Sequence, residues 1–367
     1  MIEPKRDGGT QSVTDGARVE MILMNKKEIN SSSANAQSNG WTFQYVAALV
    51  VFLENMGLAK QFCVEGTEDI VVVLKNNDKI CAQAKSGLDQ DAIVSPHFDK
   101  IMASIATLSV NSDAIQLISI SNFHKPLGDN DAFSYMQFLD KKNFWNLTTK
   151  TQNKIREKSE KKGYVLDFNK FKLWFVRFEG AEPEQGLAEY LNRKLQKIDP
   201  GQYFPVDDLM EKWLNIIELN ARDKVKNIET DIICGTLFGK VLNSTKLSQI
   251  TNLIDVEIDP CYEEDFERFF KTYFARNSQI FKTYTLIVSD FLSYVNKTKP
   301  SKTEQYKLFV EEYCKLENIP LDIKSFFNGY NEKEELSLDF YKLFIAYVCY
   351  KRNVVKAIRG VFGYEDN

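Results

Sequence analysis

The chain has no long apolar segment, few histidines and no paired-cysteine motif. No apolar run reaches about 18 residues and the polar N-terminus lacks a signal-peptide core, so we expect a cytoplasmic protein with no membrane span. Two histidines and six scattered cysteines, none in a CxxC pair, argue against a structural zinc site. The net charge of −4 provides no basic field over the whole molecule, so any nucleic-acid surface must be local.

Nucleotide-binding and nucleophile motifs are also missing. The sequence contains no Walker motif, no GxGxxG loop and no Ser/Cys–His nucleophile arrangement, so we do not expect its C-terminal half to be an ATPase. The 367 residues, 44% of them apolar, predict two domains with sizeable cores. Small polar stretches at Asp7-Gly-Gly-Thr and from Ser31 onwards predict that residues 1–39 are a poorly ordered lead-in, in which residues 19–24 could form a short strand or an oligomer contact. We place an α/β domain at 40–200 and a mostly α-helical domain at 201–367, with the boundary at Asp199-Pro-Gly.

Residues 69–85 carry the most informative pattern. Residues 69–75 are β-branched and apolar, Asn76-Asn77-Asp78 suit a turn, and residues 79–85 alternate, so the stretch predicts a β-hairpin. With a three-residue turn, Asp69 lies directly opposite Lys85 and on the same face as Gln83. With a two-residue turn, Lys85 pairs with Glu68 instead and Asp69 faces the other way.

In the first register, a carboxylate, an amide and an ammonium meet on one patch. Oxygen ligands from Asp69 and Gln83 suit a hard cation such as Mg²⁺, and Lys85 could stabilise charge on a phosphate. These residues therefore predict metal-dependent phosphodiester hydrolysis. The alternative is an ordinary surface Asp–Lys pair on a hairpin, which the spacing alone does not exclude.

A helix is predicted at 41–57, before the hairpin, with Gly57 as its stop. Two polar residues on it, Gln44 and Glu54, could reach the hairpin patch, but they lie about 15 Å apart along the axis and cannot share one metal. We expect Glu54 to be solvated.

Three short motifs in this order resemble the PD-(D/E)xK restriction-endonuclease-like superfamily. They are Gly40-Trp-Thr-Phe-Gln44, Glu65-Gly-Thr-Glu-Asp69 and Gln83-Ala-Lys85. The sequence is most similar to the double-stranded-DNA endonuclease domain of bacterial anti-phage systems, namely CBASS effectors, Lamassu nuclease subunits and HerA-associated nucleases. The resemblance covers about 40–180.

The resemblance implies a role for each matched residue. It makes Asp69 the central metal ligand, Gln83 a ligand in place of the usual Glu, and Lys85 the catalytic lysine. Gln44 stands where many relatives carry a carboxylate on the helix. With two amides in the set, Glu65 or Glu68 could supply further charge for Mg²⁺ or Mn²⁺.

The resemblance also implies how such a protein works. We expect a restriction-endonuclease-like fold and a metal-dependent endonuclease that is activated by an ATPase subunit of SMC-like or HerA type, or by assembly into a dimer or tetramer. The second interpretation is a catalytically weak or inactive subunit that keeps the fold to bind DNA or a partner. The intact Asp69, Gln83 and Lys85 favour the enzyme.

A basic segment at 141–163 predicts a DNA contact beside this domain. It holds seven Lys and one Arg against two Glu, and a basic helix here could grip phosphates without reading sequence. The alternative is a solvated helix. The candidate DNA-binding residues are Lys141, Lys142, Lys150, Lys154 and Arg156.

Periodicity predicts the remaining elements. In the α/β half these are a helix from Ser95, a buried strand at 114–122, a strand at 170–179 and a helix from Pro183. Beyond residue 200 we expect almost only helices, at 205–222, 262–275, 279–297, 302–316 and 335–360.

Overall fold

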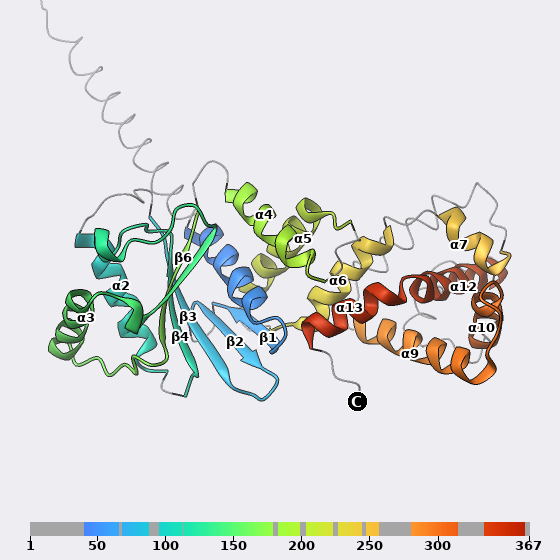
Figure 1. Cartoon of the computed structure of the whole chain (residues 1–367), viewed down its shortest axis with the longest axis horizontal. Helices are drawn as coiled ribbons and strands as arrows, with labels where there is room; N and C mark the ends of the chain where they lie inside the picture. Colours follow the sequence, from blue (N-terminus) through green and yellow to red (C-terminus); the bar gives the residue numbers. More distant parts are fainter. Residues whose placement is uncertain are drawn as a thin grey trace, which may run out of the picture.

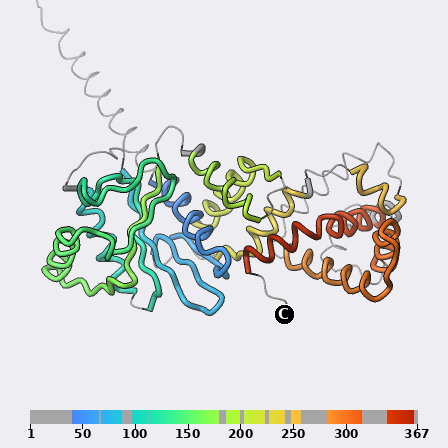
Figure 2. Tube along the Cα trace, in the orientation of Figure 1, coloured from blue at the N-terminus to red at the C-terminus, as the bar shows by residue number. Residues whose placement is uncertain are grey.

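A computed structural model describes residues 40–65, 68–87, 95–111, 113–178, 183–198, 203–222, 227–243, 247–256, 280–314 and 334–363. The predicted lead-in at 1–39 and the predicted helix at 262–275 lie outside these ranges. The described chain forms an α/β half, built on one mixed sheet, followed by a mainly helical half (Figures 1 and 2). Among the described residues, no helix is both long and apolar enough to cross a membrane.

The sheet has seven strands in the order β5-β6-β4-β3-β2-β1-β7. Three adjacent strands, β6, β4 and β3, are parallel to one another, and the remaining strands pair antiparallel to their neighbours. The strands are β1 Ala59–Val64, β2 Ile70–Leu74, β3 Lys79–Lys85, β4 Gln116–Ser121, β5 Leu139–Asn143, β6 Phe171–Val176 and β7 Ile228–Glu229.

Helices cover both faces of the sheet (Figure 1). One face packs against α2 (Ser95–Leu108) and α3 (Thr149–Lys161), in a core that contains Phe98, Ile105 and Ile155. The other packs against the helix at 40–54, α4 (Pro183–Leu195) and α5 (Val206–Arg222). The side chains of β3 alternate between these faces: Cys81 lies in the first core and Ala82 in the second.

Most elements predicted for the α/β half are confirmed, but two strands were missed. The helix at 40–54, the hairpin, α2, β4, β6 and α4 occur where the sequence places them. Strand β1 was not predicted. The basic segment was expected to be a helix, yet it begins with strand β5 and the short helix η2 (Phe144–Asn146).

Helix α3 begins only at Thr149 because Thr148 caps it. The hydroxyl of Thr148 accepts from the backbone N–H of Thr151 at 3.4 Å. It also donates to the buried Asp131 at 2.8 Å, and the backbone N–H of Thr148 donates to the same carboxylate at 2.8 Å. Asp131 therefore fixes the residue from which the helix starts.

The helical half contains α6 (Thr230–Asn243), α7 (Leu247–Ile254), α9 (Ile280–Thr298), α10 (Gln305–Tyr313), α12 (Glu334–Tyr350) and α13 (Arg352–Phe362). Helices α6 and α7 were not predicted. The single helix expected at 335–360 is wrong, since Lys351, with φ −89° and ψ 16°, leaves the helical conformation and separates α12 from α13.

One hydrophobic core crosses residue 200, where the sequence predicted a boundary. Strand β7 pairs with β1 at the edge of the sheet, and Phe62 lies opposite Ile228. At the end of the chain, α13 returns to the sheet, where Phe362 packs 6.4 Å from Phe52 between ring centroids. Buried residues from the helix at 40–54 through to Phe362 form one cluster.

The loop of the β2–β3 hairpin holds the C-terminal end of α13. The Lys75 ammonium donates to three backbone carbonyls, of Gly57 at 3.1 Å, Phe362 at 2.7 Å and Gly363. A cation at a helix C-terminus satisfies unpaired carbonyls and opposes the helix dipole. Gly363 has a φ of +61°, and a Cβ there would lie 2.3 Å from the oxygen of Gly57, so only glycine fits.

We therefore expect Lys75→Met to lower the free energy of unfolding by about 1–2 kcal/mol, because it removes a charged donor from these carbonyls. Urea denaturation of the full chain measures the change. Lys79→Met is the matched control, since Lys79 forms only an exposed pair with Asp113 at 3.1 Å, which contributes little. Equal losses in the two variants would contradict this role of Lys75.

Candidate active site

The hairpin register brings Asp69, Gln83 and Lys85 onto one face, though neither register considered from the sequence occurs. The turn comprises Lys75–Asn77, one residue earlier than predicted, and the backbone N–H of Leu74 donates to Asp78 at 2.8 Å. Asn77 adopts a φ of 67°, which asparagine tolerates in such turns. Ile70 therefore pairs with Ala82. This register differs by two residues from the three-residue-turn prediction, so each side chain keeps its predicted face.

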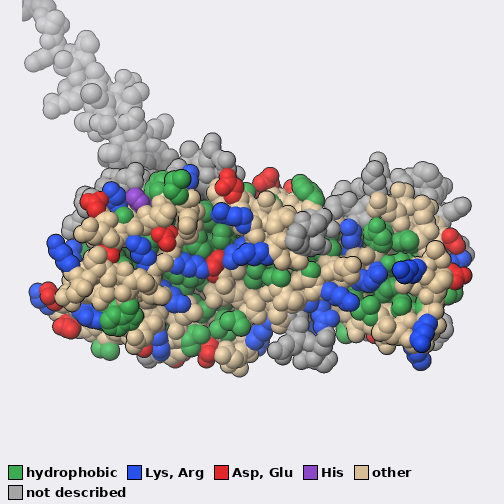
Figure 3. All heavy atoms as spheres, viewed as in Figure 1, with side chains coloured by type: hydrophobic (Ala, Val, Ile, Leu, Met, Phe, Trp, Pro, Cys, Tyr) green, Lys and Arg blue, Asp and Glu red, His purple; other side chains and the backbone are tan. Residues whose placement is uncertain are grey.

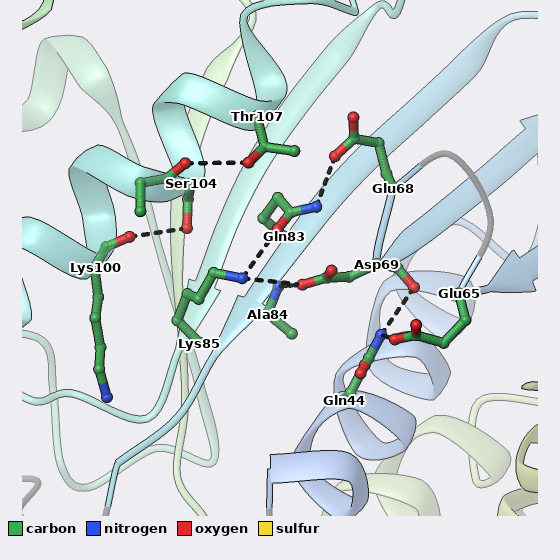
Figure 4. A network of polar contacts seen from close by, with 11 residues as sticks. Gln44, Glu65, Glu68, Asp69, Gln83, Ala84, Lys85, Lys100, Ser104 and Thr107 are labelled. Atoms are coloured by element: carbon green, nitrogen blue, oxygen red, sulfur yellow. Dashed lines mark hydrogen bonds and ion pairs between the residues drawn. The ribbon is translucent and has the colours of Figure 1, made fainter. Parts of the chain in front are cut away.

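A carboxylate, an amide oxygen and an ammonium meet at the end of this hairpin (Figure 4). The Lys85 Nζ donates to Oδ2 of Asp69 at 3.4 Å and to Oε1 of Gln83 at 3.1 Å. Oδ2 of Asp69 also accepts from the backbone N–H of Ala84 at 2.9 Å, so it continues the hydrogen-bond ladder beyond β2. The Asp69 and Lys85 side chains are 25% and 31% exposed, so both are in contact with solvent.

Gln83 is held from its other end by the buried carboxylate of Glu68. Nε2 of Gln83 donates to Oε2 of Glu68 at 2.6 Å, and Nδ2 of Asn111, just after α2, donates to Oε1. Burial raises the pKa of Glu68, and so does the charge of Asp69, while the hydrogen bonds from Asn111 and Gln83 act to lower it.

Gln44 and Glu65 form a separate pair beside Asp69. Nε2 of Gln44 donates to Oε1 of Glu65 and, at 3.3 Å, to the backbone carbonyl of Asp69. The Asp69 carboxylate points towards Lys85 (Figure 4). Gln44 and Glu65 thus lie on the side of Asp69 that carries its backbone carbonyl, and they fix the backbone rather than the carboxylate.

Glu54 is not solvated, contrary to our expectation. Its carboxylate pairs with Lys141 and, at 2.6 Å, with Lys194, and it accepts from the Tyr190 hydroxyl at 2.5 Å. Burial acts to raise the pKa of Glu54, but the hydrogen bonds from Lys141, Lys194 and Tyr190 outweigh it and bring the pKa down to about 2. This cluster joins the helix at 40–54 to β5 and α4, away from the hairpin site.

The structure does not gather the five candidate DNA-binding residues on one surface. On β5, Lys141 pairs with Glu54, whereas Lys142 donates to the carbonyls of Asp131 and Ala132 at 3.0 and 2.7 Å. The other three, Lys150, Lys154 and Arg156, lie on α3.

The cations on α3 differ in their surroundings. Lys150 and Lys154 are exposed, and the Lys154 ammonium lies 4.0 Å from the centroid of the Phe98 ring. The Arg156 guanidinium lies 5.0 Å from the centroid of Trp145. In Figure 3, Lys and Arg side chains are spread over both halves of the visible face.

Oxygen donors at the hairpin fit a hard cation. The Lys85 ammonium already contacts one oxygen from Asp69 and one from Gln83, so two oxygens converge on one positive charge. Of these two oxygen ligands, only Asp69 carries a negative charge. Such a small ligand set suits Mg²⁺, an ion that keeps several of its waters. In the described part of the chain, no group of three or more His, Cys, Asp or Glu residues is arranged to hold a metal ion.

Sequence reasoning overlooked Asn111 and gave Glu68 only a secondary place. Glu68 is 4% exposed, and its neighbour Asp69 was the one signal that could have led to it. Asn111 follows α2, and no sequence pattern around it points to the site.

Comparisons of the chain with models of known protein families, with curated proteins and with solved structures found no match, so geometry and chemistry carry the assignment of this site.

The pKa of Glu54 predicts how the stability depends on pH. Since the folded pKa of about 2 lies below the ordinary value of 4.5, Glu54 stabilises the fold above pH 4.5, and this contribution is lost as the pH falls towards 2. We expect Glu54→Gln to cost on the order of 2 kcal/mol at pH 7.

The loss caused by Glu54→Gln should shrink between pH 4.5 and pH 3, as measured by urea denaturation at a series of pH values. Asp99→Asn is the control, because Asp99 pairs with Lys158 on the surface and should change the stability little. A loss from Glu54→Gln that is the same at pH 3 and pH 7 would show that the ionised carboxylate is not the source.

Proposed function

We propose that this protein is a metal-dependent endonuclease that cuts double-stranded DNA and that its α/β half is restriction-endonuclease-like. The observation that carries the proposal is the convergence of Asp69, Gln83 and Lys85, in which one ammonium contacts a carboxylate oxygen and an amide oxygen. The order of the motifs at 40–44, 65–69 and 83–85 supports the same assignment.

Asp69 and Gln83 would hold Mg²⁺ or Mn²⁺, which would polarise the phosphodiester and lower the pKa of a bound water. Glu65, which the sequence also suggested as a ligand, is paired with Gln44 on the far side of Asp69 and has no part in this site. In the hydrolysis, the oxygen of water bonds to phosphorus, the bond to the leaving oxygen breaks, and that oxygen takes up a proton. Lys85 serves as a fixed donor to the phosphate oxygens, on which negative charge develops. Asp69 and Gln83 hold its ammonium in place. Gln44 supports the backbone of Asp69.

The partial exposure of Asp69 and Lys85 suits a polymeric substrate. Helix α3, which packs against α2 on the site's side of the sheet, offers Lys150 and Lys154 to the DNA backbone. Such contacts bind phosphates without regard to base sequence.

The proposal includes regulation by a partner. As the resemblance implies, the nuclease acts in the cytoplasm as an anti-phage effector and is activated by an SMC-like or HerA-type ATPase or by forming a dimer or tetramer. The helical half is the part available for such contacts.

A non-catalytic assembly subunit is the second candidate. The observation in its favour is that positions 44 and 83 hold amides, and that both amides are engaged with Glu65 and Glu68 inside the protein. The two candidates differ in whether cleavage depends on Lys85.

We expect the protein, alone or with its ATPase partner, to cut linear and supercoiled duplex DNA when Mg²⁺ or Mn²⁺ is present. EDTA should abolish cleavage. Lys85→Ala should reduce the rate by roughly 10²–10³-fold, since a preorganised donor at the reacting phosphate is lost. Cleavage is followed on agarose gels.

Lys79→Ala, on the same strand but in a surface pair with Asp113, should cut like the wild type. Cleavage that persists undiminished in Lys85→Ala would remove the hairpin as the catalyst. If neither the protein nor its complex cuts, the assembly-subunit interpretation replaces the enzyme.

The double variant Lys150→Ala/Lys154→Ala should bind duplex DNA more weakly, because each phosphate contact releases counterions. The slope of log K against log salt, measured by fluorescence anisotropy, should fall by roughly one for each lysine. Lys282→Ala, an exposed site on α9, is the control. An unchanged slope in the double variant would place the DNA elsewhere.

A further inference from the structure

The buried Glu68 beside the candidate active site has no role in the reaction described above. It is 4% exposed, and its two oxygens accept from different amides, Oε2 from Gln83 at 2.6 Å and Oε1 from Asn111. Asn111 is itself held at the end of α2, where its backbone N–H donates to Leu108 at 3.1 Å. A carboxylate buried between two amide donors is held in one place.

Glu68 dictates which way the Gln83 amide points. The NH₂ group of Gln83 faces Glu68 and donates to Oε2 at 2.6 Å, and a carboxylate in its ionised form can only accept hydrogen bonds. Oε1 of Gln83 then faces Lys85, which donates to it at 3.1 Å. The flipped amide would oppose oxygen to oxygen at Glu68 and NH₂ to ammonium at Lys85. Gln83 is 3% exposed, so its amide cannot escape to water instead.

We propose that Glu68 is a positioning residue, which acts through Gln83 to aim the amide oxygen at the cation site and at Lys85. This inference rests on the proposed function. It also explains why residue 83 is an amide, because a glutamate there would bury a second carboxylate directly against Glu68.

The exchange of the two side chains provides the test. In Glu68→Gln/Gln83→Glu, the new amide at 68 accepts from Asn111 and donates to the new carboxylate at 83, which in turn accepts from Lys85. Every hydrogen bond is kept, and the negative charge moves next to the cation site. Gln83→Glu alone places two carboxylates against each other. Glu68→Gln alone removes the carboxylate that fixes the orientation of the Gln83 amide.

We expect Gln83→Glu to lower the melting temperature of the full chain by about 5 °C or more, and the exchange variant to regain most of it. Gln116→Glu makes the same chemical change on the neighbouring strand β4, at a half-buried position, and should have little effect. Additive shifts at positions 68 and 83 would overturn the proposed pairing.

Titration calorimetry with Mn²⁺ separates positioning from packing. Glu68→Gln should weaken Mn²⁺ binding about tenfold or more while the protein stays folded, and the exchange variant should bind Mn²⁺ more tightly than the wild type. Equal Mn²⁺ affinity in all three proteins would overturn the positioning role. If the wild type neither binds Mn²⁺ nor cuts DNA, the proposed function and this role fail together. Thermal coupling that persists then identifies Glu68–Gln83 as a structural pair.

Discussion

The pairing of β2 with β3 is the constraint on which both ends of the hairpin depend. At one end, it sets Asp69 level with Gln83 and brings Lys85 within hydrogen-bonding distance of both. At the other end, its turn presents Lys75 to the last carbonyls of α13. A slip of one residue would turn every side chain of one strand to the opposite face and dismantle the site. The same hairpin therefore connects the candidate active site to the helical half.

Charged side chains form two separate clusters on opposite faces of the sheet. On the α2 side, Asp69 faces Lys85, while the buried Glu68 accepts from two amides. On the other side, Glu54 collects Lys141, Lys194 and Tyr190. The first cluster is partly exposed at Asp69 and Lys85. In it, one oxygen of Asp69 and the amide oxygen of Gln83 both contact the Lys85 ammonium. The second cluster contains Lys141, which the sequence suggested as a DNA-binding residue. It joins the edge strand β5 to the helix at 40–54 and to α4.

Local patterns were sufficient to predict most elements of the α/β half. The run of β-branched residues before Asn76, the alternation after it and the apolar periodicity of α2 each reflect local chemistry, and these elements are confirmed. The turn was placed one residue too late because Lys75 was expected in the strand. Lys75 lies in the turn, where its ammonium donates to carbonyls at the end of α13, which is remote in sequence. Glu54 and Asn111 were misjudged or missed for the same reason: their partners are remote in sequence, and no spacing encodes them.

The most direct test of the account is a crystal of the protein soaked in Mn²⁺ and measured for anomalous scattering. If Asp69 and Gln83 form a hard-cation site, an anomalous peak will lie at coordination distance from a carboxylate oxygen of Asp69 and from Oε1 of Gln83, close to Lys85. The peak should be absent from Asp69→Ala crystals. A wild-type map with no peak at the hairpin, or with Mn²⁺ bound only at other carboxylates, would contradict the claim that this site performs metal-dependent chemistry.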